Sequence, residues 1–399
     1  MRKKITYKIA VLGVALLIFL FLNSFLPHLF SAEYVSTTVE KSDTEAYLKE
    51  DIIESKILPT PEPLKAIYIT ACVASTPKWR EKLVDLVLKT ELNAVVIDIK
   101  DYTGTVSFPN NFPRSKSQKG CVVNDMKEFI QSLNDSGIYV IGRISVFQDL
   151  SYTTLFPELA VKSKATGDIW RDKKGIGFID VGALPYWDYI LELSRESVLI
   201  GFDELNYDYI RYPSDGNMQD AYYSWMKPEH TKAQMLEDFF KFLNKNVSEL
   251  NVKTSADLFG MTTTVQNDLG IGQILEKALP YFDYIAPMVY PSHYPPNWNG
   301  FVNPAQHPYD VIKIAMSSGL RREQNFKQSI GVATSTPSKL RPWIQDFNLG
   351  AIYDEKKVRD QIRAVYDVGL SSWMLWDSGN TYTESALNID RQIAEIQNQ

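Results

Sequence analysis

The sequence predicts an α/β fold, a (β/α)8 TIM barrel preceded by an N-terminal transmembrane anchor and a polar linker. Three observations predict the barrel. Short apolar, β-branched runs alternate with amphipathic stretches of helical length from residue 64 almost to the C-terminus. The apolar runs are nearly continuous, as strands buried on both faces require, which favours a parallel sheet covered by helices. Eight such units follow one another, which is the number that closes this barrel.

Each predicted element follows from this alternation. The expected strands span residues 66–73, 94–99, 139–146, 202–209, 254–259, 284–289, 329–333 and 372–376. The expected helices span residues 78–90, 124–135, 185–199, 231–250, 271–279, 309–317, 355–368 and 383–397. Long connections follow the second, third, fourth and sixth strands, whereas the returns from helix to strand are short. This asymmetry predicts a binding face at the carboxyl ends of the strands.

Residues 1–30 form a basic tip and an apolar segment. Arg2, Lys3, Lys4 and Lys8 precede residues 9–30, which lack charged side chains and are long enough to cross a bilayer. The positive flank predicts a cytoplasmic N-terminus. A cleaved signal peptide and an uncleaved anchor both fit, and Phe30, where a small residue is preferred before cleavage, favours the anchor. Either interpretation places the remaining chain outside the cytoplasm, and the anchor places it at the cell membrane.

Residues 31–63 are polar and end with Pro59, Pro61 and Pro63, which is typical of a solvated spacer. The folded domain is therefore predicted to span residues 64–399. Cys72 and Cys121 are the only cysteines. In an oxidising compartment they can pair, or they can remain two separate buried thiols.

Composition narrows the possible partners and cofactors. An apolar fraction of 45% and an aromatic fraction of 12% are ample for a large core. A net charge of -6 and a pI near 5.5 argue against nucleic acid, whose phosphates attract basic proteins. The four histidines show no HxH or HExxH spacing, and no CxxC pattern occurs, so no metal and no cofactor is predicted.

The fourth predicted strand carries an unusual concentration of charge, in the run GFDELNYDYIRYP at residues 201–213. Side chains alternate along a strand, so Glu204, Asn206 and Asp208 share one face, which we assign to the barrel interior. Asp208 lies nearest the carboxyl end and is expected to open into the pocket. Glu204 is expected deeper, with Arg143 of the neighbouring strand as its partner. Asp257 ends the next strand and is expected beside Asp208.

Other strand ends supply further candidates. The predicted catalytic residues are Asp208, Asp257 and Asp98, and the predicted substrate-binding residues are Asn206, Arg211, Arg143, Asp101, Tyr290, Trp376 and Asp377. Structural roles remain open for several of them. Asp98 and Asp101 bracket Lys100 and could cap a strand or form an ion pair, and Asp257 could cap a turn. Arg211 could be a salt-bridge partner, and Trp376 could fill the barrel.

Paired carboxylates at a barrel mouth are the equipment for glycoside hydrolysis, in which one is protonated and the other ionised. The long loops also carry aromatic residues, which can either stack on sugar rings or pack the loops onto the barrel. They are Tyr152, Trp170, Tyr222, Tyr223, Trp225, Tyr294 and Trp298. The predicted partner is therefore a polysaccharide or cell-wall glycan. A carbohydrate-binding barrel that no longer cleaves its ligand is the alternative.

Five segments carry a family resemblance. They are AIYITACVAS (66–75), NAVVIDIKDYTG (93–104), IDVGALPYWDYI (179–190), GFDELNYDYIRYP (201–213) and APMVYPSHY (286–294). Together they resemble a bacterial family of glycosyl hydrolase-like domains, catalogued as domain of unknown function 4015 (DUF4015). The resemblance implies a TIM barrel related to α-amylase-like hydrolases, with an aspartate nucleophile on the fourth strand and the acid on the fifth. Asp208 falls on the nucleophile, and Asp257 falls near the acid, where the amylase pattern has Glu.

The fourth strand is also similar to the chitinase signature FDGIDIDWEYP. Aligned from Phe202, Asp203 and Asp208 match signature aspartates, whereas Asn206 replaces another. Ile210 occupies the place of the proton-donating Glu. A chitinase mechanism therefore lacks its acid here, and the similarity indicates shared architecture rather than shared chemistry.

Overall fold

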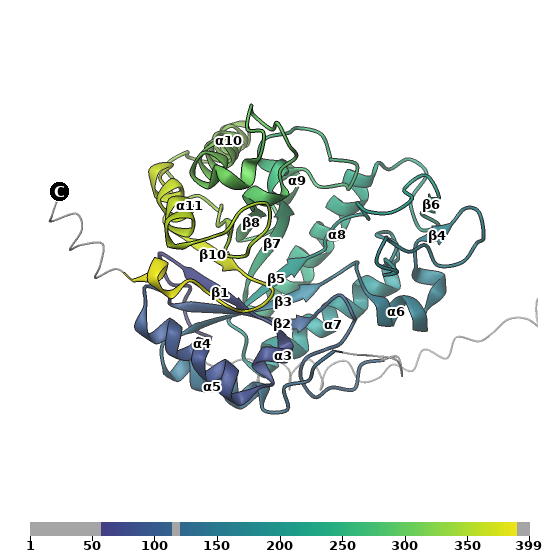
Figure 1. The fold of residues 1–399 in the computed structure, drawn as a ribbon. Helices are drawn as coiled ribbons and strands as arrows, with labels where there is room; N and C mark the ends of the chain where they lie inside the picture. Colours follow the sequence, from purple (N-terminus) through teal and green to yellow (C-terminus); the bar gives the residue numbers. More distant parts are fainter. Residues whose placement is uncertain (1–56, 114–119, 389–399) are drawn as a thin grey trace, which may run out of the picture. The chain divides into compact units, whose positions relative to one another are not determined.

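The computed structural model describes residues 57–113 and 120–388. Within them, eight parallel strands close into a barrel in the order β1-β10-β9-β8-β7-β5-β3-β2 (Figure 1). The strands are β1 (Lys65–Ile69), β2 (Ala94–Lys100), β3 (Tyr139–Ser145), β5 (Glu204–Asp208), β7 (Lys253–Phe259), β8 (Tyr284–Met288), β9 (Trp343–Gln345) and β10 (Trp373–Trp376). This confirms the predicted closed, all-parallel barrel.

Helices surround the barrel (Figure 1). They are α3 (Ala71–Ala74), α4 (Pro77–Lys89), α5 (Met126–Asp135), α6 (Leu150–Leu155), α7 (Leu184–Ile200), α8 (Lys232–Val247), α9 (Leu275–Ala278), α10 (Pro308–Ser329) and α11 (Glu355–Asp367). Two short antiparallel strands, β4 (Lys162–Ser163) and β6 (Ala221–Tyr222), join the loop after β3 to the loop after β5. These two loops therefore form one wall beside the mouth.

Local sequence explains where the elements around β5 begin and end. Gly201 ends α7 with φ at +113°, a conformation that glycine adopts without a Cβ penalty, and turns the chain into β5. Thr231 caps α8 by accepting from the Gln234 N–H, while the Gln234 side chain accepts from the Thr231 N–H. The capping box fixes the point at which the loop after β5 returns to the barrel wall.

The predicted strand at residues 329–333 is wrong. Helix α10 continues to Ser329, and Ile330 and Val332 are 55% and 40% exposed, unlike residues of a barrel strand. The observed strand there is β9, which has three residues and directly follows Pro342. A run that short gives no alternating or continuous apolar pattern to detect.

Several predicted boundaries also differ from the observed ones. The helix expected at residues 309–317 extends to Ser329, and the one expected at 271–279 is reduced to α9. The first strand ends at Ile69, and Ala71–Ala74 is helical instead. Of the helix expected at 383–397, the described part forms a 3-10 turn at Glu384–Leu387, and residues 389–397 lie outside the described residues.

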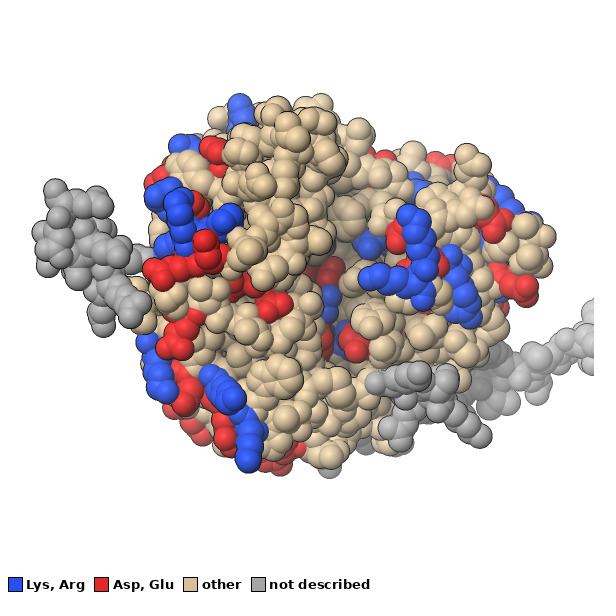
Figure 2. Space-filling view, in the orientation of Figure 1, with Lys and Arg blue, Asp and Glu red and all other residues tan. Residues whose placement is uncertain are grey.

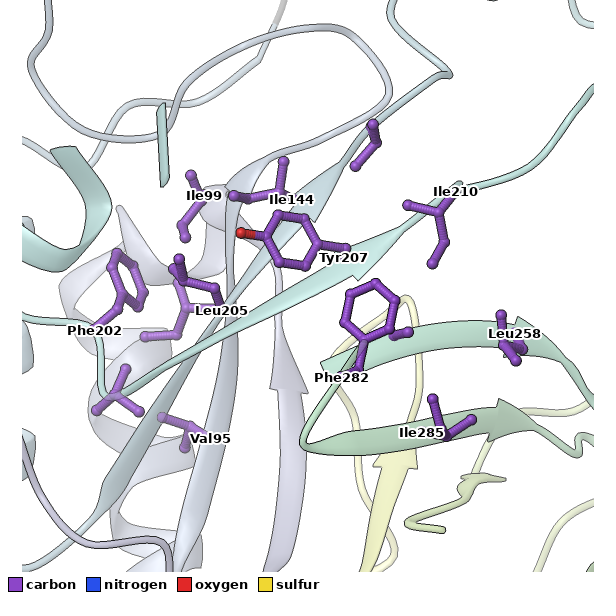
Figure 3. Packing of buried hydrophobic residues seen from close by; sticks show 14 of the residues in the cluster. Val95, Ile99, Ile144, Phe202, Leu205, Tyr207, Ile210, Leu258, Phe282 and Ile285 are labelled. Carbon is purple, nitrogen blue, oxygen red and sulfur yellow. The ribbon is translucent and has the colours of Figure 1, made fainter. Parts of the chain in front are cut away.

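The two faces of β5 have opposite environments, as the alternation predicts. Leu205 and Tyr207 point outward among apolar side chains of neighbouring strands and helices, close to Ile144 and Phe282 (Figure 3). The Tyr207 hydroxyl shares a 2.9 Å hydrogen bond with Ser194 of α7. Glu204, Asn206 and Asp208 face the barrel interior and are 0%, 0% and 5% exposed. The interior is a packed core with polar residues only in defined layers.

Residues 57–63, which the sequence assigns to the linker, contact the amino-terminal end of the barrel. The Leu58 N–H donates to Asp203 Oδ1 over 2.7 Å, and Thr60 shares a 3.0 Å hydrogen bond with the Tyr139 hydroxyl. These contacts hold the chain against the barrel before β1 begins. The rest of the predicted linker and the apolar segment 9–30 lie outside the described residues. Across residues 57–113 and 120–388, no helix is long and apolar enough to span a bilayer.

Cys72 and Cys121 form a disulfide, which confirms the first of the two alternatives. The bond joins α3 to the long loop after β2. It therefore fixes part of the wall of the barrel mouth.

Candidate active site

Asp208 is the last residue of β5 and lies at the barrel mouth. The next residue, Tyr209, has φ at +51°, a left-handed conformation that is uncommon for an aromatic residue. Its N–H donates to Asp208 Oδ1 over 2.5 Å. Such backbone strain persists where surrounding contacts enforce it, often at functional sites. Here it turns the chain sharply at the residue that the sequence singles out as the nucleophile.

Arg143 of β3 joins two carboxylates at this level. Its Nη1 donates to Asp98 Oδ1 over 2.6 Å, and its Nε and Nη2 donate to Asp208 Oδ2 over 3.1 and 2.5 Å. The Tyr68 hydroxyl donates to the other oxygen of Asp98. All four side chains are buried. Burial raises the pKa of Asp98, while Arg143 and the Tyr68 hydroxyl oppose that rise.

The expected pairing of Arg143 with Glu204 is wrong. Glu204 instead accepts from Arg341, which lies just before β9, and from Ser255 Oγ over 2.6 Å. In the register of the barrel, Arg143 lies opposite Asn206, between Glu204 and Asp208. Its long side chain extends toward the mouth, so it contacts Asp208 rather than the deeper carboxylate.

Asp257 of β7 lies among hydrogen-bond donors. Asn206 Nδ2 and Trp343 Nε1 both donate to Asp257 Oδ1, each over 2.8 Å. The residue is only 1% exposed. Burial, reinforced by the negative charge of Asp208, raises the pKa of Asp257 to about 8, although Arg143 opposes the shift. Burial therefore favours the protonated form of the Asp257 carboxyl.

A cleft of about 440 Å³ opens above these residues. Its lining is Arg143, Asp208, Tyr209, Arg211, Phe259, Gly260, Met261, Met288, Tyr290, His293, Tyr294 and Trp376. In the space-filling view a hollow with basic and acidic atoms lies near the middle of the face (Figure 2). Trp376 stacks on Tyr68 with ring centroids 3.9 Å apart and 13° between the planes. The cleft therefore places a carboxylate beside a flat aromatic surface, the combination that sugar binding uses.

A second hollow of about 750 Å³ adjoins the cleft and shares Tyr209 and Arg211 with it. Its other lining residues come from the loops after β2, β3 and β5, namely Tyr102, Thr103, Gln148, Leu150, Ser151, Asp172, Lys174, Ile176, Phe178, Ser214 and Asp215. The long loops thus extend the binding surface beyond the barrel axis, as their lengths predict.

The structure brings together some of the predicted site residues and leaves others apart. Asp208, Arg143, Arg211, Tyr290 and Trp376 line the cleft. Asp98 contacts this cluster through Arg143, whereas Asn206 and Asp257 bond to each other, to Ser255 and to Trp343, and none of these three predicted residues is on the cleft wall.

Asp101 and Asp377 lie outside this cluster and shape turns. Asp101 accepts from the N–H and hydroxyl of Thr103, and Asp377 accepts from the N–H groups of Gly379 and Thr381. These local bonds use the carboxylates as turn formers. Two of the loop aromatics, Trp170 and Tyr152, are 2% and 9% exposed and pack their loops onto the barrel.

The residues of the site that were not predicted include Tyr68, Tyr209, Trp343 and His293. Tyr68 follows Ala66 on the inward face of β1, so the alternation of that strand could have identified it. Tyr209 and His293 lie in loops, where no period applies. Trp343 belongs to the strand that the sequence pattern did not reveal.

The comparisons with known proteins agree with this architecture. Residues 66–382 match a family model described as "putative glycosyl hydrolase domain" (DUF4015), which confirms the resemblance. The comparison with curated proteins finds no match.

Two of the following solved structures share the fold. The glycoside hydrolase domain of PgaB (BpsB) from Bordetella bronchiseptica has a TM-score of 0.57 and 14% identity, over 82% of this chain and 99% of that one. Alpha-L-fucosidase isoenzyme 2 from Paenibacillus thiaminolyticus has a TM-score of 0.55 and 11% identity, over 84% of this chain and 49% of that one. A hypothetical protein from Ruminiclostridium thermocellum is 29% identical over 51% of this chain and 98% of that one, with a TM-score of 0.42.

Within residues 57–113 and 120–388, no group of three or more His, Cys, Asp and Glu side chains is arranged to hold a metal ion.

Proposed function

The chain belongs to this family of glycosyl hydrolase domains, and from that premise we propose that it is a glycoside hydrolase acting on a glycan polymer. The observation that carries the proposal is Asp208, a carboxylate on the wall of an aromatic-lined cleft with the Arg143 guanidinium against it. A charge-assisted contact of this kind orients the carboxylate and holds one oxygen in place. The resemblance to α-amylase-like hydrolases also implies a nucleophile at this position of the fourth strand.

The proposed reaction uses two carboxyl groups in different protonation states. Asp208 attacks the anomeric carbon as the bond to the leaving oxygen breaks, and Asp257 gives its proton to that oxygen. A water molecule that gives its proton to the ionised Asp257 then attacks the same carbon and releases the sugar from Asp208. The raised pKa of Asp257 supports its role as the acid. Because Asp257 is not on the cleft wall, the role requires its carboxyl to become accessible when substrate binds. Catalytic hydrogen bonds often form only in the substrate complex.

We also propose that the enzyme works outside the cytoplasm, tethered to the membrane by residues 9–30, on a cell-wall or extracellular polysaccharide. Two features support this location. The N-terminal apolar segment follows four basic residues. The Cys72–Cys121 disulfide is typical of proteins that fold in an oxidising compartment.

A non-catalytic glycan-binding barrel is the second candidate. The observation that favours it is the burial of Asp257, which is 1% exposed and therefore sealed from a bound glycan in this conformation. Under this alternative the cleft binds sugars but transfers no proton to them.

The deciding experiment compares the wild type with Asp208→Asn on a panel of soluble polysaccharides, with new reducing ends as the readout. We expect at least about a 10³-fold loss of turnover in Asp208→Asn, since the nucleophile is removed. Asp310→Asn, which changes an exposed carboxylate, is the matched control and should keep full activity. Retained turnover in Asp208→Asn would exclude the proposed nucleophile. Glycan binding without product from the wild type would favour the second candidate.

A further inference from the structure

Arg211 occupies the junction between the cleft and the adjoining hollow. It is three residues beyond Asp208 in the chain, and both residues line the cleft. Arg211 and Tyr209 are the residues that also line the second hollow. The Arg211 side chain is only 9% exposed. A glycan chain that runs from one hollow into the other therefore has to pass this guanidinium.

The guanidinium of Arg211 is not neutralised by a direct contact. Its Nη1 donates to the Tyr212 carbonyl oxygen and to Ser214 Oγ, each over 3.1 Å. Its Nε and Nη2 donate to no atom of the described residues, and no carboxylate among them lies within ion-pair distance. Burial of an unpaired guanidinium is costly, and arginine remains charged in proteins. One edge of the planar fork therefore has no partner among the described residues.

Aromatic rings hold the guanidinium in place. Its central carbon lies 4.8 Å from the ring centroid of Phe259, 5.1 Å from that of Tyr209 and 5.7 Å from that of Phe178. Cation–π contacts of this kind compensate part of the burial and fix the plane of the fork. The ring faces supply no hydrogen-bond acceptor, so Nε and Nη2 of Arg211 remain without an acceptor among the described residues.

The carboxylates that face the two hollows have other partners. Asp208 pairs with Arg143, and Asp215 pairs with Lys173 over 3.0 Å. Asp172 accepts from the N–H groups of Lys174 and Ile176 and from Gln148 Nε2. These groups lower the electrostatic potential at the junction but do not occupy the Arg211 fork. Lys174, which lines the second hollow, adds a further positive charge.

We propose that the junction binds a carboxylate carried by the glycan, so that the substrate is an acidic polysaccharide and Arg211 determines that specificity. A carboxylate matches the two free donors of the fork in a bidentate contact. The volumes of the two hollows allow sugars on both sides of this contact, since each lies in the range of small-molecule sites. The inference rests on the proposed glycan-degrading function and specifies its substrate class.

The test uses pairs of oligosaccharides that differ only in charge. The acidic probes are oligomers of galacturonate, whose carboxylate is part of the sugar, and peptide-free cell-wall glycan strands, whose carboxylate is on a lactyl ether. Each is compared with its carboxyl-reduced, neutral counterpart. We expect the wild type to bind one acidic probe at least about tenfold more tightly than its reduced counterpart. The probe that shows the preference identifies the source of the carboxylate.

Two variants assign the preference to the fork. Arg211→Gln should abolish it, and Arg211→Lys, which keeps the charge but loses the bidentate geometry, should retain only part of it. Lys173→Gln removes a nearby cation that is 76% exposed and should leave the preference intact. The wild-type comparison needs no variant, so a folding defect in Arg211→Gln would not prevent the test.

The outcomes separate this inference from the proposed function. Equal affinity for both members of every pair, or binding of no acidic probe at millimolar concentration, would overturn it, as would a preference that survives in Arg211→Gln. The same samples are assayed for new reducing ends. A preference without product would support the acidic ligand and contradict the hydrolase, whereas cleavage of neutral glycans without preference would do the reverse.

Discussion

The barrel interior holds two clusters in which an arginine contacts carboxylates, one deep and one at the mouth. In the deep cluster Glu204 accepts from Arg341 and Ser255, and the two charged side chains are 0% and 1% exposed. In the mouth cluster Arg143 joins Asp98 and Asp208 beside the cleft. The residue types are the same, but only the mouth cluster meets a space that a ligand can enter. Glu204, in the structural ion pair, and Asp208, in the site, are four residues apart on the same face of β5.

The two regions also differ in what an unpaired guanidinium N–H donor indicates about function. Arg341 Nε and Nη1 have no hydrogen-bond partner, yet they are buried and the guanidinium lies over the Tyr284 ring at 4.3 Å. Arg211 Nε and Nη2 lack partners too, but that side chain lines two hollows. Burial without a partner is costly for the Arg341 atoms, whereas the Arg211 atoms are not among the fully buried unpaired ones. Unpaired donors point to a ligand only where a ligand has access.

The largest effect expected from this comparison is on stability, in the deep cluster. Arg341→Met leaves Glu204 buried without its cation, and we expect the free energy of unfolding to fall by about 3–5 kcal/mol. Urea denaturation followed by circular dichroism measures it. Turnover per folded molecule should fall much less than in Asp208→Asn, because the deep cluster reaches the site only indirectly, through the hydrogen bonds of Asn206 to Ser255 and Asp257.

Adding Glu204→Gln to Arg341→Met provides the control. With both charges removed, most of the lost stability should return, since the cost arises from the unpaired carboxylate rather than from the missing contact. If Arg341→Met alone were as stable as the wild type but inactive, the distinction between a structural and a functional cluster would be wrong.

At the mouth, Asp257→Asn should act on catalysis. Asn cannot donate a carboxyl proton, so we expect turnover of unactivated glycosides to fall about 10²- to 10⁴-fold. A glycosyl fluoride, whose leaving group needs little protonation, should be cleaved at nearly the wild-type rate and serves as the matched control. Equal losses on both substrates would show that Asp257 is not the acid.

The same variant tests the protonation state through the pH dependence of stability. The pKa of Asp257 is about 8 in the folded protein and near 4 in the unfolded chain. Between these values the unfolded state releases a proton that the folded state keeps, so this residue's contribution falls as pH rises from about 4 to about 8. Relative to Asp257→Asn, the wild type should lose stability across that window. A pH-independent difference would contradict the raised pKa.

The fold and the three residues of the mouth cluster, Arg143, Asp98 and Asp208, were predictable because they follow from periods along single strands. Alternation in β5 identified the inward face of Glu204, Asn206 and Asp208. The partner of Arg143 was not predictable, since it depends on the register between β3 and β5 and on the length of the arginine side chain. The strand carrying Trp343 has three residues and therefore no detectable period. Arg341, just before it, gave no signal for the same reason.

The smallest expected effects come from two adjacent residues at the end of β10 that the sequence assigns to one site. Trp376 lies on the cleft wall, whereas Asp377 accepts hydrogen bonds within its own turn. Trp376→Leu keeps an apolar side chain but removes the flat ring, so we expect KM to rise about threefold to tenfold with kcat nearly unchanged. Asp377→Asn keeps one of the turn's two acceptor oxygens and should change KM by less than about twofold. Steady-state kinetics on one polysaccharide measures KM for both variants. A larger change in KM from Asp377→Asn than from Trp376→Leu would mean that the substrate contacts the rim of the barrel rather than the cleft.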